Sequence, residues 1–265
     1  MMKIENQQWT LQTAGLSDRG LRRSHNEDSL SVIPPLGLFV VADGMGGHNA
    51  GEVASRQAIE SMVTFIHSAR DGNSASWPVP SDPKLSPQEN KLVAAIKIAN
   101  RDVCRLSMEY PEYQGMGTTL VALLTDPEDS TATMAHVGDS RCYRVRDGKM
   151  EKLTFDHSWV EEQLQRGIIT PQEARSHRWK NVITRALGNK LEVEVDVQSV
   201  PIEDQDLFLL CSDGLSGMVE NEEMEQLARE EPDLEDLARK MIAAANNAGG
   251  QDNISLILIR FLRNT

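Results

Sequence analysis

Four apolar segments of this 265-residue chain begin or end next to an aspartate that has a glycine within three residues. The clearest is LFVVADG, residues 38–44, in which Asp43 follows five apolar residues. Short apolar runs bounded by turn residues are typical of strands that are covered on both faces. A fold that accommodates them must bury the strands and leave the aspartates at the strand ends. The four aspartates are Asp43, Asp139, Asp213 and Asp252.

The order of the predicted elements favours an α+β fold. Strand-like runs gather near both ends of the chain, and three long 3.6-residue patterns predict helices over 51–69, 91–108 and 232–248. A capping-box pattern predicts a short helix at 170–173, and residues 191–200 alternate like a strand with one wet face. Grouped strands, without strict βαβ alternation, indicate antiparallel sheets. The Pro/Ser-rich stretch 70–90 is interpreted as a surface loop inside one domain spanning 1–265.

Clustered carboxylates repel one another and lose solvation when buried, so their convergence calls for a compensating cation. Mg²⁺ and Mn²⁺ prefer oxygen ligands, which several strand-end aspartates supply. The alternative is that each Asp-Gly pair only marks a turn. A second polar cluster, residues 17–28, holds three arginines among acidic residues. It is either a phosphate-binding segment or a solvated loop with ion pairs.

Composition narrows the classes of partner and location. The net charge of -13 argues against binding to a nucleic-acid backbone. The three cysteines are widely spaced and predict reduced core thiols, not a disulfide or zinc framework. Neither a secretory leader nor an apolar run of about 18 residues is visible, so we expect a cytoplasmic protein that does not bind a membrane. We also expect a monomer.

Six motifs occur together in the order DRGLRRSHNED, ADGMGGHNAGEVAS, GMGTT, HVGDSR, CSDGL and GGQDN. Together they resemble the metal-dependent serine/threonine protein phosphatases of type 2C in their bacterial form, the PPM family. The resemblance runs from Ala14 to Arg260. It implies a four-layer α-β-β-α sandwich of two mainly antiparallel sheets flanked by helix pairs, which agrees with the grouping of elements above.

The resemblance also implies a centre of two Mn²⁺ or Mg²⁺ ions and a role for each matching residue. Asp43 would bridge the ions and the Gly44 carbonyl would bind one of them. Asp213 and Asp252 would hold the other ion. The remaining matches are Glu27 and Asp28, which would support metal-bound waters; Arg23, which would bind the substrate phosphate; and Asp139, which would hold a third metal ion together with Asp213. The segment from Asp156 to Asn181 resembles the flap beside the site in bacterial members.

The implied reaction is direct hydrolysis of phosphoserine and phosphothreonine on proteins, in which a metal-bridged hydroxide attacks phosphorus in line. Bacterial relatives commonly oppose a eukaryote-like Ser/Thr kinase. Animal members place a histidine acid where this chain has Met45, so His48 is the nearest candidate acid or phosphate contact. His157 and His177 of the flap are either phosphate contacts or surface residues. Two alternatives are a phosphohydrolase for small esters and an inactive phosphoprotein-binding relative.

Overall fold

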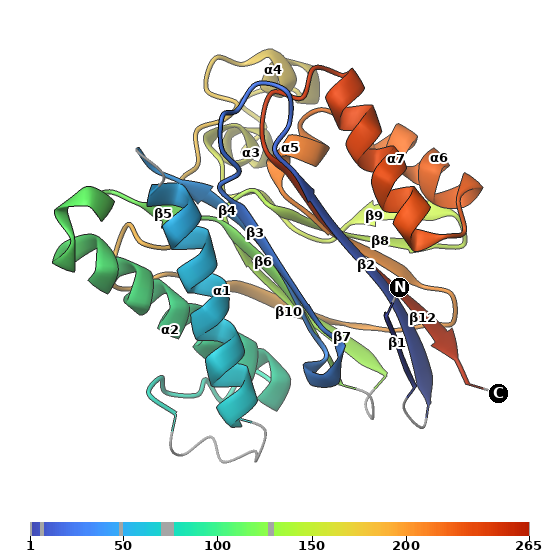
Figure 1. Cartoon of the computed structure of the whole chain (residues 1–265), viewed down its shortest axis with the longest axis horizontal. Helices are drawn as coiled ribbons and strands as arrows, with labels where there is room; N and C mark the ends of the chain where they lie inside the picture. The colour runs from blue at the N-terminus through green and yellow to red at the C-terminus, as the bar shows by residue number, and fades with distance from the viewer. Residues whose placement is uncertain (1, 6–7, 48–49, 70–76, 127–129, 265) are drawn as a thin grey trace.

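The computed structural model describes residues 2–5, 8–47, 50–69, 77–126 and 130–264. Its strands form two antiparallel sheets (Figure 1). The first has the order β1-β2-β12-β11-β8-β9, and the second has the order β10-β7-β6-β4-β3, with β5 added beside β4. The bounds are β1 Met2–Glu5, β2 Trp9–Asp18, β3 Asp28–Ile33, β4 Leu38–Met45, β5 Gly117–Thr118, β6 Leu120–Asp126, β7 Thr131–Val137, β8 Arg141–Arg146, β9 Lys149–Lys152, β10 Asp196–Pro201, β11 Leu207–Cys211 and β12 Ile254–Arg263.

Three apolar clusters separate four layers of structure. One lies between the two sheets and contains Phe39, Phe208 and Ile257. The other two lie on the outer faces, where alternate residues of the same strands meet helices. Strands with both faces buried explain the apolar runs of the sequence, since every second side chain serves a different cluster. The expected α+β sandwich of two antiparallel sheets is confirmed.

Two helix pairs cover the sheets (Figure 1). Helices α1 and α2 pack on the second sheet, and α6 and α7 pack on the first. Helix α2 begins with a complete capping box between Ser86 and Glu89. The third predicted helix starts later than expected, because Asp233 caps α7 and Pro232 lies outside it. The bounds are α1 Ala50–Ser68, α2 Pro87–Glu109, α6 Asn221–Glu230 and α7 Leu234–Asn247.

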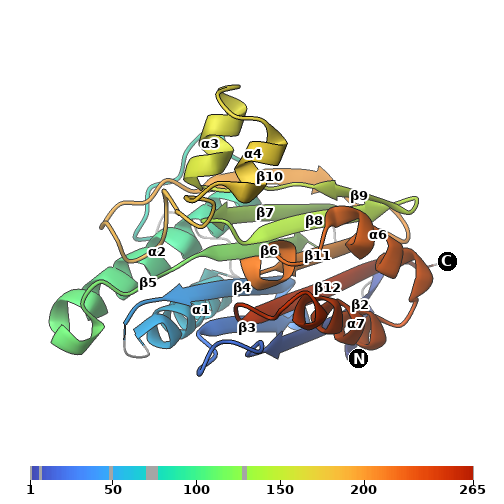
Figure 2. The ribbon, with the colours of Figure 1, turned by 90° about the horizontal axis from the view of Figure 1, so that it is seen from above.

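The part of the chain that the structure describes also contains three shorter helices, α3 Trp159–Gln165, α4 Pro171–Ser176 and α5 Asp213–Ser216, and two 3-10 turns, Pro34–Leu36 and Pro111–Tyr113. Helices α3 and α4 belong to the flap, residues 156–181, and lie beside the edge made by β9 and β10 (Figure 2). The strand predicted over 191–200 begins only at Asp196, where pairing with His136 of β7 starts. In the loop before α2, Trp77 packs on Phe65 and Val79 is buried, so this part is anchored to the core.

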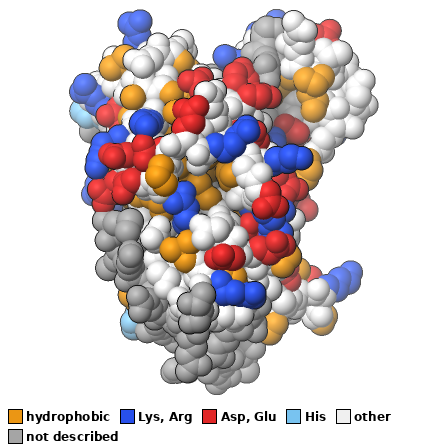
Figure 3. All heavy atoms as spheres, turned by 90° about the vertical axis from the view of Figure 1, so that its right-hand side faces the viewer, with side chains coloured by type: hydrophobic (Ala, Val, Ile, Leu, Met, Phe, Trp, Pro, Cys, Tyr) orange, Lys and Arg blue, Asp and Glu red, His pale blue; other side chains and the backbone are white. Residues whose placement is uncertain are grey.

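The face that carries α6 and α7 shows acidic and basic side chains intermingled (Figure 3). Many of them pair within one helix, as in Arg239 with Glu235 and Arg229 with Glu225. Such exposed pairs contribute little each, about 0.3–0.5 kcal/mol. Cys104, Cys142 and Cys211 are buried free thiols. Among the described residues, no helix is long and apolar enough to cross a bilayer.

Candidate metal centre

Five aspartates from five chain segments meet at the end of the sandwich where α5 lies (Figure 1). The buried strands fix their positions, because each aspartate lies within two residues of the end of a strand. Asp43 lies near the end of β4, directly opposite the first residue of β3, Asp28. The others are Asp139, two residues after β7; Asp213, at the start of α5 after β11; and Asp252, two residues before β12.

Burial, and after it the mutual repulsion of these carboxylates, raises their pKa values. Burial, and then the neighbouring charges of Asp28, Asp213, Asp139 and Asp252, hold the pKa of Asp43 well above its ordinary value. Burial raises the pKa of Asp28 to about 7 and that of Asp139 to about 8. In the absence of a cation, the folded chain therefore favours protonated carboxyl groups here.

Three carboxylate oxygens of the cluster are buried without a hydrogen-bond partner: Asp28 Oδ1, Asp139 Oδ1 and Asp213 Oδ1. Buried polar atoms nearly always have a hydrogen-bond partner, so three unpartnered oxygens in one cluster indicate that a ligand of these oxygens is missing. Protein donors supply only part of it, since Asp28 Oδ2 accepts from the Ser212 hydroxyl at 2.8 Å. All-oxygen donors with surplus negative charge match hard divalent cations such as Mg²⁺ and Mn²⁺. The residues present fit such a cation.

Arg23 lies at the rim of this cluster. Its Nη2 donates to Asp252 Oδ2 at 2.7 Å, while the guanidinium remains half exposed. The loop on both sides of Arg23 is held by Asn253, whose Nδ2 donates to the backbone carbonyls of Arg19 and His25. Asn253 Oδ1 accepts the Glu27 N–H at 2.8 Å. One amide therefore fixes the loop that carries both predicted residues Arg23 and Glu27.

Gly44 is required by the close approach of three segments. A Cβ on this residue would lie 2.1 Å from the Gly51 carbonyl oxygen and 2.5 Å from that of Glu27. The Gly44 N–H donates to the same Glu27 oxygen at 3.2 Å. The Ser55 hydroxyl of α1 also donates to it, at 2.7 Å. The glycine lets β4, the Glu27 loop and the start of α1 pack together behind Asp43.

The structure brings together nearly all predicted site residues. Arg23, Glu27, Asp28, Asp43, Gly44, Asp139, Asp213 and Asp252 lie in or beside the cluster. His48 lies outside the described residues. Met45 is the last residue of β4 and pairs with Gly117 of β5.

The two flap histidines differ. His157 is buried, so it is not a surface residue, whereas His177 stacks on Trp159 within the flap. Sequence reasoning missed Asn253 and the partners of His157, because their roles depend on contacts between segments far apart in the chain. The pairing of Asp252 with an adjacent asparagine was the only local signal for Asn253.

A cleft of about 440 Å³ opens beside the aspartates and extends under the flap. Asp139 and Asp213 line it together with Ser158, Pro171 and Lys180 of the flap. The cleft therefore connects two of the predicted metal ligands with the flap. Arg141 and Asp156, paired at 2.6 Å, also line it.

Known proteins match the chain over nearly its full length. The model of the family "Protein phosphatase 2C" matches residues 22–259. The serine/threonine phosphatase stp of Listeria innocua is 38% identical over 247 residues, 92% of this chain and 93% of that protein. The crystal structure of Mycobacterium tuberculosis PstP/Ppp has a TM-score of 0.82 at 35% identity, covering 96% of this chain and 99% of that one. The catalytic domain of PstP in complex with two manganese ions has a TM-score of 0.78 at 34% identity, covering 95% and 98%.

These matches are consistent with the order of the six motifs and with the two-sheet sandwich. The family expected from the sequence is thereby confirmed. The chain is a member of the protein phosphatase 2C family.

Proposed function

We propose that this phosphatase hydrolyses phosphoserine and phosphothreonine on proteins by direct attack of water at a site of two divalent ions. The observation that carries the proposal is the set of three buried, unpartnered carboxylate oxygens at converging strand ends. The manganese ions in the structure of the PstP catalytic domain support Mn²⁺ as the cation. Divalent ions bound here would lower the pKa of a coordinated water and supply the attacking oxygen.

Each residue of the proposed site then has a defined role. Asp43, Asp213 and Asp252 would hold the two ions, with the Gly44 carbonyl as a further ligand and Asp139 beside them for a third ion. Glu27 and Asp28 would accept hydrogen bonds from ion-bound waters. Arg23, half exposed and fixed by Asp252, would bind two oxygens of the phosphate and stabilise charge that develops on them. Rigid strand ends keep these groups in place before the substrate arrives.

The cysteines are unsuited to nucleophilic attack. Burial raises the pKa of the Cys142 thiol beyond the normal range and that of Cys211 to about 12. Neither thiol would be ionised near neutral pH, and both point into apolar clusters. No phosphoenzyme intermediate is needed for the proposed reaction.

The test compares hydrolysis of a phosphothreonine peptide and of p-nitrophenyl phosphate by the purified chain, with Mn²⁺ and with EDTA. We expect Mn²⁺-dependent turnover that EDTA abolishes, and a higher kcat/KM for the peptide. A preference for the small ester would favour a general phosphohydrolase. Absence of turnover with Mn²⁺ would favour an inactive phosphoprotein-binding protein and overturn the proposal.

The wider setting is proposed from the family and the composition. The partners would be phosphorylated proteins, including a Ser/Thr kinase whose action the phosphatase reverses. We propose that it acts in the cytoplasm as a monomer. Phosphoproteomics of a strain lacking the phosphatase would identify its substrates, because their phosphosites should gain occupancy.

A further inference from the structure

His157 connects the flap to the loop that carries Asp139. Its side chain is buried, with 7% exposed. Its backbone N–H donates to the Gly138 carbonyl at 2.9 Å, and its Nδ1 accepts the Gly138 N–H at 3.0 Å. One flap residue thus holds both polar backbone groups of Gly138. Because Gly138 directly precedes Asp139, these bonds help to set the direction in which the Asp139 carboxylate leaves the backbone.

The same loop is confined from its other side. Gly138 has φ +107°, and a Cβ on it would lie 2.5 Å from the Cβ of Thr119. The Thr119 hydroxyl shares a hydrogen bond of 2.7 Å with Ser140, and the Thr119 N–H donates to the Asp43 carbonyl at 2.9 Å. Asp139 therefore lies in a turn held between the flap and the segment that contacts the Asp43 backbone.

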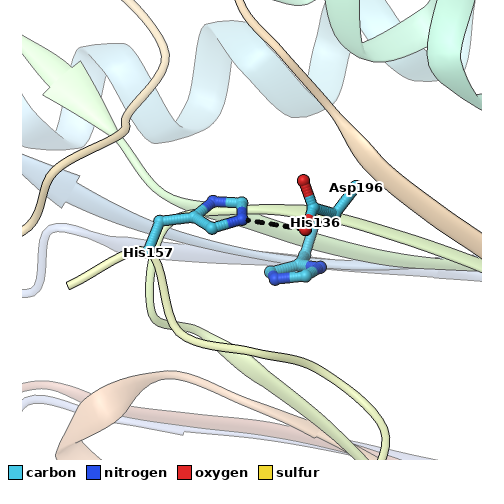
Figure 4. Close-up of side chains that lie close together, drawn as sticks. All are labelled: His136, His157 and Asp196. Atoms are coloured by element: carbon cyan, nitrogen blue, oxygen red, sulfur yellow. Dashed lines mark ion pairs between the residues drawn. The ribbon is translucent and has the colours of Figure 1, made fainter. Parts of the chain in front are cut away.

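The hydrogen bond to Gly138 requires a neutral imidazole in one tautomer. Since a backbone N–H donates to Nδ1, the His157 proton is on Nε2, which faces Asp196 Oδ2 at 3.3 Å (Figure 4). Burial, the stacked ring of His136 and the charge of Arg185 lower the pKa of His157 to about 4, against the opposing effect of Asp196. The ring is thus neutral at physiological pH, as its contact with Gly138 demands.

The group His136, His157 and Asp196 resembles a metal site in its spacing, because ligand atoms of the three lie within 4.8 Å of one another. However, Arg185 already supplies the cation. Its Nη1 donates to Asp196 Oδ1 at 2.6 Å and lies 3.0 Å from His157 Nε2. A guanidinium stays charged at any physiological pH and would repel a metal ion. The cluster is therefore better explained as a support for the His157 ring.

The residue before His157 holds the other side of the same loop. Asp156 accepts from Arg141 Nε at 3.0 Å and from Arg141 Nη2 at 2.6 Å. Arg141 lies two residues after Asp139. Two consecutive residues at the base of the flap thus contact the chain on both sides of Asp139.

We propose that His157 is a positioning residue that aims the Asp139 carboxylate at a divalent ion, and that Asp196, itself held by Arg185, fixes the imidazole for this task. The inference rests on the proposed role of Asp139 in the metal centre. Groups that orient metal ligands from behind commonly change metal affinity by about 10–100-fold when replaced. The unpartnered Asp139 Oδ1 is the atom whose direction this contact would control.

The experiment measures Mn²⁺ binding by titration calorimetry of the apo-protein, independently of activity. His157→Leu removes the acceptor, whereas His157→Asn places a carbonyl oxygen near the former position of Nδ1. We expect His157→Leu to lower the affinity for one Mn²⁺ ion by at least about tenfold. This should be the same ion whose binding Asp139→Asn weakens. His157→Asn should stay within about threefold of the wild type. His67→Leu, an exposed histidine at the end of α1, is the matched control and should bind as the wild type does.

Asp196→Ala provides a second variant if His157→Leu does not fold, because Asp196 is half exposed. Asp196→Ala should weaken binding of the same Mn²⁺ ion, since the His157 imidazole loses its partner at Nε2. The inference is overturned if Asp139→Asn loses Mn²⁺ affinity but His157→Leu binds Mn²⁺ like the wild type. Asp196→Ala takes the place of His157→Leu in this comparison if that variant does not fold. The proposed metal centre would stand in that case. If the wild type binds no Mn²⁺, the inference and the proposed function fail together. Equal losses of Mn²⁺ affinity in His157→Leu and His157→Asn would also overturn the inference.

Discussion

Asp28 and Asp43 lie directly opposite each other on neighbouring antiparallel strands, β3 and β4. Like charges at such positions destabilise a sheet, and burial adds to the cost. The Ser212 hydroxyl compensates for only one oxygen of Asp28. The pair therefore stores a repulsion in the apo-protein that a divalent cation would relieve.

Replacing Asp43 with asparagine should separate stability from metal binding. In EDTA at pH 8, the unfolding free energy of Asp43→Asn should rise by about 1 kcal/mol, because the repulsion with Asp28 disappears. Mn²⁺ should stabilise the wild type by about 2.7 kcal/mol at 100 times its Kd and the variant far less. Turnover should fall on the order of 10³-fold. Urea unfolding with and without Mn²⁺ measures the change in unfolding free energy and the stabilisation by Mn²⁺. Near-normal Mn²⁺-dependent turnover of Asp43→Asn would exclude Asp43 from the site.

The stability of the chelated protein should fall as pH rises from 6.5 to 8.5. Asp28 and Asp139 bind their protons more tightly in the folded chain, with pKa values of about 7 and about 8 against an ordinary 3.8. The unfolded chain is already deprotonated in this range while the folded chain still holds these protons, so raising the pH destabilises the folded state until the folded pKa values are passed. The expected decrease for the two groups together is about 2–3 kcal/mol. Urea unfolding in EDTA measures it, and Asp139→Asn should flatten the curve; a rise in wild-type stability would contradict the prediction.

Arg23→Ala should chiefly raise KM for a phosphopeptide, by about tenfold, which corresponds to about 1.4 kcal/mol of binding free energy. The guanidinium is at the rim and half exposed, so its loss should leave the fold intact. Steady-state kinetics at saturating Mn²⁺ provides the measurement. Arg263→Ala, an exposed arginine stacked on Trp9 away from the aspartates, is the control. An unchanged KM for Arg23→Ala would exclude phosphate binding by this residue.

Gly44→Ala should destabilise the fold by about 2–3 kcal/mol, because the added methyl group meets backbone atoms that cannot move independently. Gly47→Ala, just after the end of β4, is the matched control, since a Cβ there has nothing within 4 Å. Chemical denaturation of both variants in EDTA separates this effect from metal binding. Equal stability of the two would show that β4, the Glu27 loop and α1 are not tightly packed at Gly44.

Much of the fold was predictable because local patterns and global packing agree. The run 38–42 is apolar throughout, and the structure buries it between two layers. The Asp147-Gly148 pair predicts a tight hairpin, and both residues have positive φ between β8 and β9. The pattern at 191–200 misled, because alternation is also compatible with a loop whose partner strand ends early. Pairing with β7 decided where β10 begins.

The sequence by itself determined the apolar strands, the aspartates at their ends and the family to which the six motifs belong. These features are local, since a strand end places its next residue at a sheet edge whatever the partner strand is. The tertiary structure alone decided which residues hold the aspartates in place. Asn253 binds a loop more than 220 residues away in sequence. His157 binds Gly138, from which it is separated in the sequence by β8 and β9. Hydrogen bonds between distant segments leave no periodic trace in a sequence, so only the folded chain reveals them.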